Sequence, residues 1–84
     1  MHDGSSFAGW QVLLRTECGL CEEMILSLGS LLGDAARHIA VVDIDEHPEL
    51  VRKYGSRVPV LLVDGEVVCC YRLDEGRVKD HLPG

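Results

Sequence analysis

The chain has 84 residues, of which 46% are hydrophobic and 26% charged, so it is apolar enough for one folded domain and too apolar for a disordered protein. Its formal net charge is −6 and its eight lysines and arginines are scattered, which excludes nucleic acid as an expected partner. No apolar run approaches the length of a bilayer span, and no signal-like apolar core precedes the first strand. We therefore expect a cytoplasmic monomer that does not bind membranes.

The first nine residues are rich in glycine, serine and aspartate and show no periodicity. We interpret residues 1–9 as a flexible N-terminal tail and residues 10–84 as a single domain. The segment from Trp10 to Arg15 is short and apolar, which predicts a central strand covered on both faces.

A pair of cysteines, Cys18 and Cys21, follows this strand in a C-x-x-C motif. Unpartnered N–H groups at the start of a helix stabilise a thiolate, and the thiolate is both the nucleophile and the metal ligand. Because Cys21 lies about one helical turn after Cys18, the two sulfurs could close a small disulfide ring. The spacing alone also fits half of a zinc site or two incidental thiols. Because four cysteines in a reducing compartment favour a functional role, we prefer redox chemistry.

The next segments alternate between helix and strand. Apolar residues at spacings of three and four predict an amphipathic helix from Cys21 to about Leu32, with Gly33 as its C-terminal cap. A second strand is expected at residues 39–44. Proline favours a first helical position, so a short helix is predicted from Pro48 to Tyr54, ended by Gly55.

The last third of the chain predicts a hairpin and a final helix. Residues 57–63 and 66–71 are two strands, joined by the two-residue turn signal Asp64-Gly65. A short polar helix follows at residues 74–82, with acids at its start and basic residues near its end. The predicted order is β-α-β-α-β-β-α, with a parallel first pair of strands and an antiparallel hairpin.

This succession, with C-x-x-C at a helix start and Val58-Pro59 opening the third strand, resembles the thioredoxin-like fold. The resemblance implies the α/β class and a glutaredoxin-type, four-stranded mixed sheet. The segment DIDEHPELVRKYGSRVPVL, residues 43–61, is similar to that of small glutaredoxin-like bacterial proteins. The resemblance implies that Cys18 is the nucleophile, that Cys21 resolves the mixed disulfide and that the Val58-Pro59 bond is cis.

The implied function is that of a thiol–disulfide oxidoreductase that reduces protein or glutathione mixed disulfides. Its partners would be disulfide-containing proteins or glutathione, and its electron donor a reductase or glutathione. We expect no metal and no tightly bound cofactor, with glutathione as a candidate co-substrate. The residues assigned to substrate binding are Arg57, Val58, Pro59, Asp74 and Glu75.

Two departures from the glutaredoxin pattern keep other functions open. Gly19-Leu20 replaces the usual Pro-Tyr between the cysteines, and residues 69–72 lack the glycine pair of the glutathione site, although Asp74 and Glu75 follow. The alternative is a thioredoxin-fold module that senses redox state or binds a protein without catalytic turnover. A further alternative is metal carriage through the C-x-x-C motif.

Four other residues could carry chemistry. Cys69 and Cys70 are adjacent on a predicted strand, so we expect one on each face of the sheet, buried as a small hydrophobic residue. Asp43 and Asp45 end the second strand, where we expect solvated carboxylates, with a buried proton-relay carboxylate as the alternative.

Overall fold

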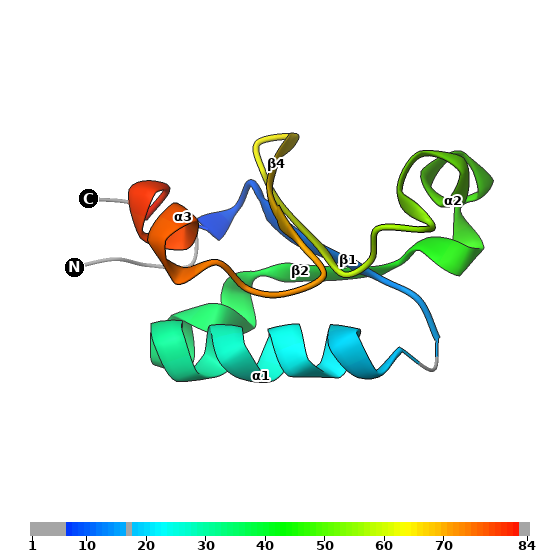
Figure 1. Cartoon of the computed structure of the whole chain (residues 1–84). Helices are drawn as coiled ribbons and strands as arrows, with labels where there is room; N and C mark the ends of the chain where they lie inside the picture. The colour runs from blue at the N-terminus through cyan, green and yellow to red at the C-terminus, as the bar shows by residue number, and fades with distance from the viewer. Residues whose placement is uncertain (1–6, 17, 83–84) are drawn as a thin grey trace.

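The computed structural model describes residues 7–16 and 18–82 and contains one four-stranded sheet (Figure 1). The strands are β1 (Trp10–Leu14), β2 (Ala40–Asp43), β3 (Val60–Val63) and β4 (Glu66–Cys70). The helices are α1 (Gly19–Leu32), α2 (Pro48–Tyr54) and α3 (Glu75–Asp80), with short 3₁₀ turns η2 (Gly33–His38) and η3 (Ile44–Glu46). Within the described part of the chain, no helix is long and apolar enough to cross a membrane.

The sheet has the order β2-β1-β3-β4, so β1 is central as predicted. β1 pairs with β2 in parallel, and β3 pairs in antiparallel fashion with both β1 and β4. Asp64 and Gly65, with φ values of 51° and 84°, form the tight turn of the β3–β4 hairpin. Positive φ at both positions matches the twist that joins two antiparallel strands. This arrangement confirms the thioredoxin-like β-α-β-α-β-β-α fold.

The two faces of the sheet are covered by different helices. Side chains of β3 alternate between the faces, because successive residues of a strand point to opposite sides. Leu61 packs in the cluster that holds Met24 of α1 and Val78 of α3, whereas Val60 packs in the cluster with Tyr54 of α2. In Figure 1, α1 runs below the sheet and α2 lies to its right.

Phe7 corrects the expected boundary of the N-terminal tail. Its side chain is 4% exposed and belongs to the same core cluster as α1 and α3. The rings of Phe7 and Trp10 meet edge to face, with centroids 5.1 Å apart. The tail predicted for residues 1–9 is therefore wrong for residues 7–9, and residues 1–6 lie outside the described part.

Candidate functional site

The two cysteines of the C-x-x-C motif lie at the start of α1. Cys18 is the N-cap residue, with an extended backbone, and its Sγ accepts a hydrogen bond from the backbone N–H of Cys21 at 3.3 Å. A sulfur in this position lies at the positive end of the helix dipole, beside the unpartnered N–H groups of the first turn. Cys18 is half-buried, whereas Cys21 is 2% exposed. An incoming disulfide can therefore reach Cys18 and not Cys21.

Burial changes the chemistry of Cys21. Loss of solvent, reinforced by its side-chain hydrogen bond with Cys18, raises the pKa of the Cys21 thiol to about 11. The nearby charge of Glu22 also raises this pKa, while a backbone hydrogen bond with Arg15 lowers it. Cys21 therefore keeps its proton at neutral pH.

The Val58-Pro59 peptide bond is cis, as predicted. Pro59 is buried, and its carbonyl oxygen accepts a hydrogen bond from the backbone N–H of Tyr71 at 2.9 Å. Val58 is half-buried, and its backbone has no hydrogen-bond partner among the described residues. Arg57 points to α2, where its guanidinium lies over the ring of Tyr54 at 5.4 Å.

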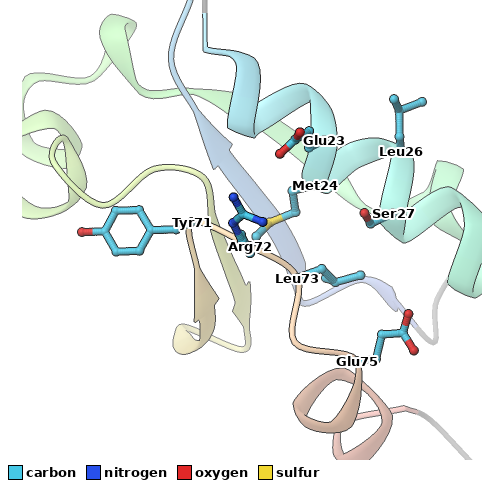
Figure 2. A pocket seen from close by; sticks show the side chains of 8 residues that line it. All are labelled: Glu23, Met24, Leu26, Ser27, Tyr71, Arg72, Leu73 and Glu75. Carbon is cyan, nitrogen blue, oxygen red and sulfur yellow. The ribbon is translucent and has the colours of Figure 1, made fainter.

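Asp74 and Glu75 take different places at the start of α3. The Asp74 side chain is the N-cap, accepting a hydrogen bond from the backbone N–H of Arg77 at 3.2 Å. Glu75 lines a groove of about 490 Å³ between α1 and the segment that joins β4 to α3 (Figure 2). The groove is lined by Glu23, Met24, Leu26, Ser27, Tyr71, Arg72, Leu73 and Glu75.

Sequence reasoning did not single out Tyr71 and Arg72 as groove residues. Tyr71 has a φ of 68°, an uncommon conformation for a residue with a side chain, and its hydroxyl donates to the carbonyl of Ser56 at 3.2 Å. Its backbone turn ends β4 and directs the Arg72 side chain toward Met24 of α1 (Figure 2). The sequence does not predict this turn, because glycine, the residue that usually adopts a positive φ, is absent from the segment.

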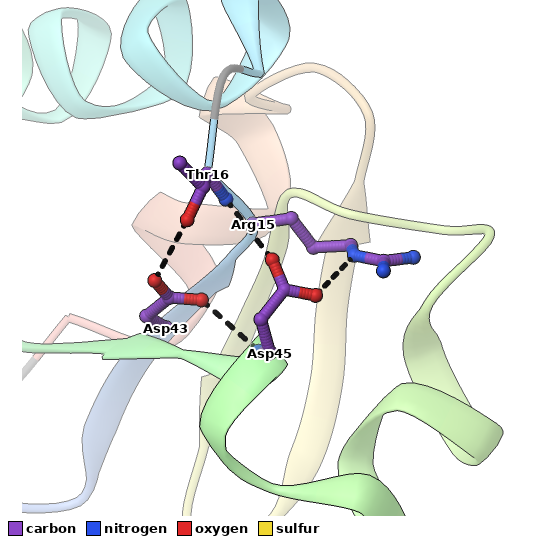
Figure 3. Close-up of polar contacts among 4 residues, drawn as sticks. All are labelled: Arg15, Thr16, Asp43 and Asp45. Atoms are coloured by element: carbon purple, nitrogen blue, oxygen red, sulfur yellow. Dashed lines mark hydrogen bonds and ion pairs between the residues drawn. The ribbon is translucent and has the colours of Figure 1, made fainter.

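A network of hydrogen bonds ties Arg15 and Thr16 to the end of β2 (Figure 3). The Asp45 carboxylate accepts from Nε of Arg15 at 2.8 Å and from the backbone N–H of Thr16 at 3.3 Å. The Asp43 carboxylate accepts from the Thr16 hydroxyl at 3.1 Å and from the backbone N–H of Asp45 at 3.0 Å. The sequence signal for this network is that Arg15 follows β1 and the two aspartates lie at the end of β2, so that opposite charges stand at the carboxyl ends of two parallel strands.

The other two cysteines occupy opposite faces of the sheet, as predicted. Cys69 is 6% exposed in the cluster with α1 and α3, and burial raises the pKa of its thiol. Cys70 is half-buried against the cluster with α2. Among residues 7–16 and 18–82, no group of three or more histidine, cysteine, aspartate or glutamate side chains is arranged to hold a metal ion.

Comparison with known proteins places the chain in a family. Residues 11–83 match the family described as "Glutaredoxin-like domain (DUF836)". Uncharacterised proteins of Mycobacterium tuberculosis and Mycobacterium bovis are each 27% identical over 74 residues, covering 82% of this chain and 76% of theirs.

Two solved structures share the fold across most of the chain. The solution structure of a Nitrosomonas europaea protein has a TM-score of 0.76 and 38% identity, covering 88% of this chain and 89% of its own. The crystal structure of an X. campestris protein has a TM-score of 0.70 and 28% identity, covering 88% and 99%. With its C-x-x-C pair at the start of α1 and a family match over nearly its whole length, the chain belongs to the glutaredoxin-like domain family.

Proposed function

We propose that the chain is a thiol–disulfide oxidoreductase that reduces protein or glutathione mixed disulfides with Cys18 and Cys21. The observation that supports this most strongly is the asymmetry of the pair. Cys18 is half-buried at the N-cap of α1, with its Sγ 3.3 Å from the Cys21 backbone nitrogen, while Cys21 is 2% exposed. The first thiol is open to a substrate, and the second is held within a turn of it.

The reaction has two thiol exchanges. The Cys18 thiolate attacks one sulfur of the substrate disulfide, a bond forms between them, and the other substrate sulfur leaves as a thiolate. Cys21 then loses its proton and attacks the Cys18 sulfur, which forms the Cys18–Cys21 disulfide and releases the reduced substrate. A reductase or two molecules of glutathione return two electrons to the protein. Metal and tightly bound cofactor have no part in these steps.

The substrate chain binds beside Val58 and Pro59 in this proposal. The Val58 backbone groups, which have no partner among the described residues, can pair with an extended peptide or with glutathione as an added strand. Arg57 and Glu75 are both exposed, and they contact parts of the substrate farther from the reacting sulfur. Asp74 supports this region by capping α3.

We place this activity in the cytoplasm and assign it to a monomer. Cytoplasmic thiols are kept reduced by the glutathione and thioredoxin systems, and cysteines there are catalytic or redox-sensing more often than structural. All four cysteines of the chain are free in the structure. The dithiol form is the one that a reducing enzyme needs at the start of its cycle.

Turnover of a glutathione mixed disulfide tests the proposal. The assay uses glutathione and glutathione reductase for recycling, with wild type, Cys18→Ser, Cys21→Ser and Cys70→Ser as matched variants. We expect Cys18→Ser to abolish turnover because no other thiol is both accessible and helix-capping. Cys70→Ser should keep the wild-type rate, and Cys21→Ser shows whether the second thiol is required.

Turnover that survives in Cys18→Ser would contradict the proposed nucleophile. A wild type that oxidises reversibly and yet does not turn over, with glutathione or with a protein disulfide and thioredoxin reductase, would contradict the proposed enzyme. That second outcome would favour the redox-sensing or protein-binding module.

A further inference from the structure

Arg15 and Thr16, which follow β1, are held by carboxylates that lie at and just after the end of β2. Both oxygens of Asp45 are used: Oδ1 accepts from Arg15 Nε at 2.8 Å, and Oδ2 accepts from the Thr16 backbone N–H at 3.3 Å. Figure 3 shows Asp45 between these two donors, with Asp43 on the other side of Thr16. The carboxylate therefore spans two consecutive residues of the segment.

The same two residues lead to the dithiol. Thr16 is two positions before Cys18 in the chain, so its backbone helps to set where the capping sulfur lies. The Arg15 backbone also lies close enough to the Cys21 thiol to lower its pKa, against the larger effect of burial. Arg15 and Thr16 are thus related to both cysteines, because Thr16 precedes Cys18 closely in the chain and the Arg15 backbone lies near the Cys21 thiol.

We propose that Asp45 is a positioning residue for the dithiol: its carboxylate clamps Arg15 and Thr16 and thereby keeps Cys18 and Cys21 within reach of each other. Asp45 touches neither sulfur and acts through the backbone that it holds. The inference rests on the proposed function, because it concerns how readily the Cys18–Cys21 disulfide forms. A looser segment lowers the effective concentration of one sulfur at the other and destabilises that disulfide.

Asp43 carries the same charge as Asp45 and also contacts Thr16, but the same substitution to asparagine should cost it fewer hydrogen bonds. An asparagine at position 45 has only one accepting oxygen, so it must lose either the Arg15 or the Thr16 bond. An asparagine at position 43 can keep both of its contacts, because the Thr16 hydroxyl can reverse and accept from the amide. Geometry therefore predicts unequal effects for two identical charge changes.

The experiment measures the equilibrium between the protein dithiol and glutathione disulfide, at a temperature at which every variant is folded. One glutathione disulfide oxidises the protein dithiol to the Cys18–Cys21 disulfide and yields two glutathione molecules, so the equilibrium constant measures how well the sulfurs are held. We expect Asp45→Asn to lower this constant by about threefold or more, the effect of one solvent-accessible charged hydrogen bond. Asp43→Asn should lower it less.

Glu46→Gln is the charge-matched control, since Glu46 is exposed in the same turn and makes no ion pair with a described residue. It should leave the constant unchanged. Should Asp45→Asn fail to fold, Arg15→Met removes one donor from the clamp, keeps the aliphatic stem and should shift the constant in the same direction.

The possible outcomes separate this inference from the proposed function. A wild type that forms no reversible Cys18–Cys21 disulfide would contradict the function itself. A normal wild type together with an Asp45→Asn or Arg15→Met constant equal to that of Glu46→Gln would overturn the positioning role and leave the function standing. Equal losses in Asp45→Asn and Asp43→Asn would assign the effect to charge and also overturn the clamp.

Discussion

Cys18 and Cys21 have different surroundings although only one helical turn separates them. Cys18 is half-buried at the N-cap of α1, and Cys21 faces the interior. The pKa of Cys21 is raised to about 11, mainly by burial, so its thiol form is the stable one in the folded protein. A nucleophile that a substrate can reach and a protonated partner are the starting state that a two-step exchange requires.

The raised pKa of Cys21 predicts a loss of stability at high pH. The pKa of the Cys21 thiol in the folded protein, about 11, lies above its ordinary value of 9.0, so folding favours the protonated thiol. This contribution to stability is complete below pH 9 and is lost as the pH rises toward 11. We expect the free energy of unfolding of the reduced wild type to fall over this range by on the order of 1–3 kcal/mol more than that of Cys21→Ser.

Chemical denaturation at several pH values checks this prediction. The oxidised protein is a second control, because a Cys21 sulfur in a disulfide does not titrate. Burial also raises the pKa of Cys69, which is present in both wild type and Cys21→Ser. Its effect on stability therefore cancels when the two pH profiles are subtracted. Parallel pH profiles for reduced wild type and Cys21→Ser would refute the assigned burial effect.

For Asp43 and Asp45, the sequence predicted the exposure of the side chains but not their hydrogen-bond partners. The expectation of solvent-accessible carboxylates at a strand end was confirmed, since Asp45 is exposed and Asp43 half-buried. Their partners were not predicted, because Arg15 and Thr16 precede them by 27 to 30 positions. Only the parallel pairing of β1 with β2 brings these groups together.

Among the elements, α2 was predicted best because both of its ends carry a strong signal. Pro48 begins it and Gly55 caps it, and the observed bounds are Pro48–Tyr54. α1 starts at Gly19 and not at Cys21, since its first turn is set by the Cys18 cap and not by apolar periodicity. α3 is shorter than predicted, Glu75–Asp80, and Leu82 beyond it is 40% exposed.

Two leucines of α1 test how this helix is held to the sheet. Leu28 is 3% exposed in the core cluster, whereas Leu26 is 71% exposed on the opposite side. We expect Leu28→Ala to lower the free energy of unfolding by about 3 kcal/mol, through lost burial and a residual cavity. Leu26→Ala should change it by less than about 0.5 kcal/mol, and urea denaturation of both variants checks the difference. Similar losses at the two positions would contradict the packing of α1.

At the scale of the whole molecule, the sheet separates two cores and the N-terminal segment completes one of them. Phe7 packs next to Trp10 in the core cluster that also contains side chains of α1 and α3. The sequence did not reveal this, because Phe7 is a single apolar residue in a polar stretch with no period. By contrast, Cys69 and Cys70 were assigned correctly to opposite faces, because strand alternation is fixed by backbone geometry.

Replacement of Phe7 tests whether this segment is part of the domain. We expect Phe7→Ala to lower the free energy of unfolding by about 3 kcal/mol, since a large buried aromatic is removed. The single tryptophan, Trp10, is 3% exposed and reports unfolding through its fluorescence. Val67→Ala, at a side chain that is 40% exposed, is the control. A Phe7→Ala curve that overlies wild type would show that Phe7 does not belong to the core.

The most direct test of the account is to locate the sulfurs that react with glutathione disulfide. Mass spectrometry of wild type after the reaction should show a loss of two hydrogens on the peptide that contains both Cys18 and Cys21. Cys21→Ser should instead carry one glutathione on Cys18, because the resolving thiol is gone. A wild type that forms no such link, or a Cys21→Ser variant that is modified on Cys69 or Cys70 and not on Cys18, would contradict the central claim.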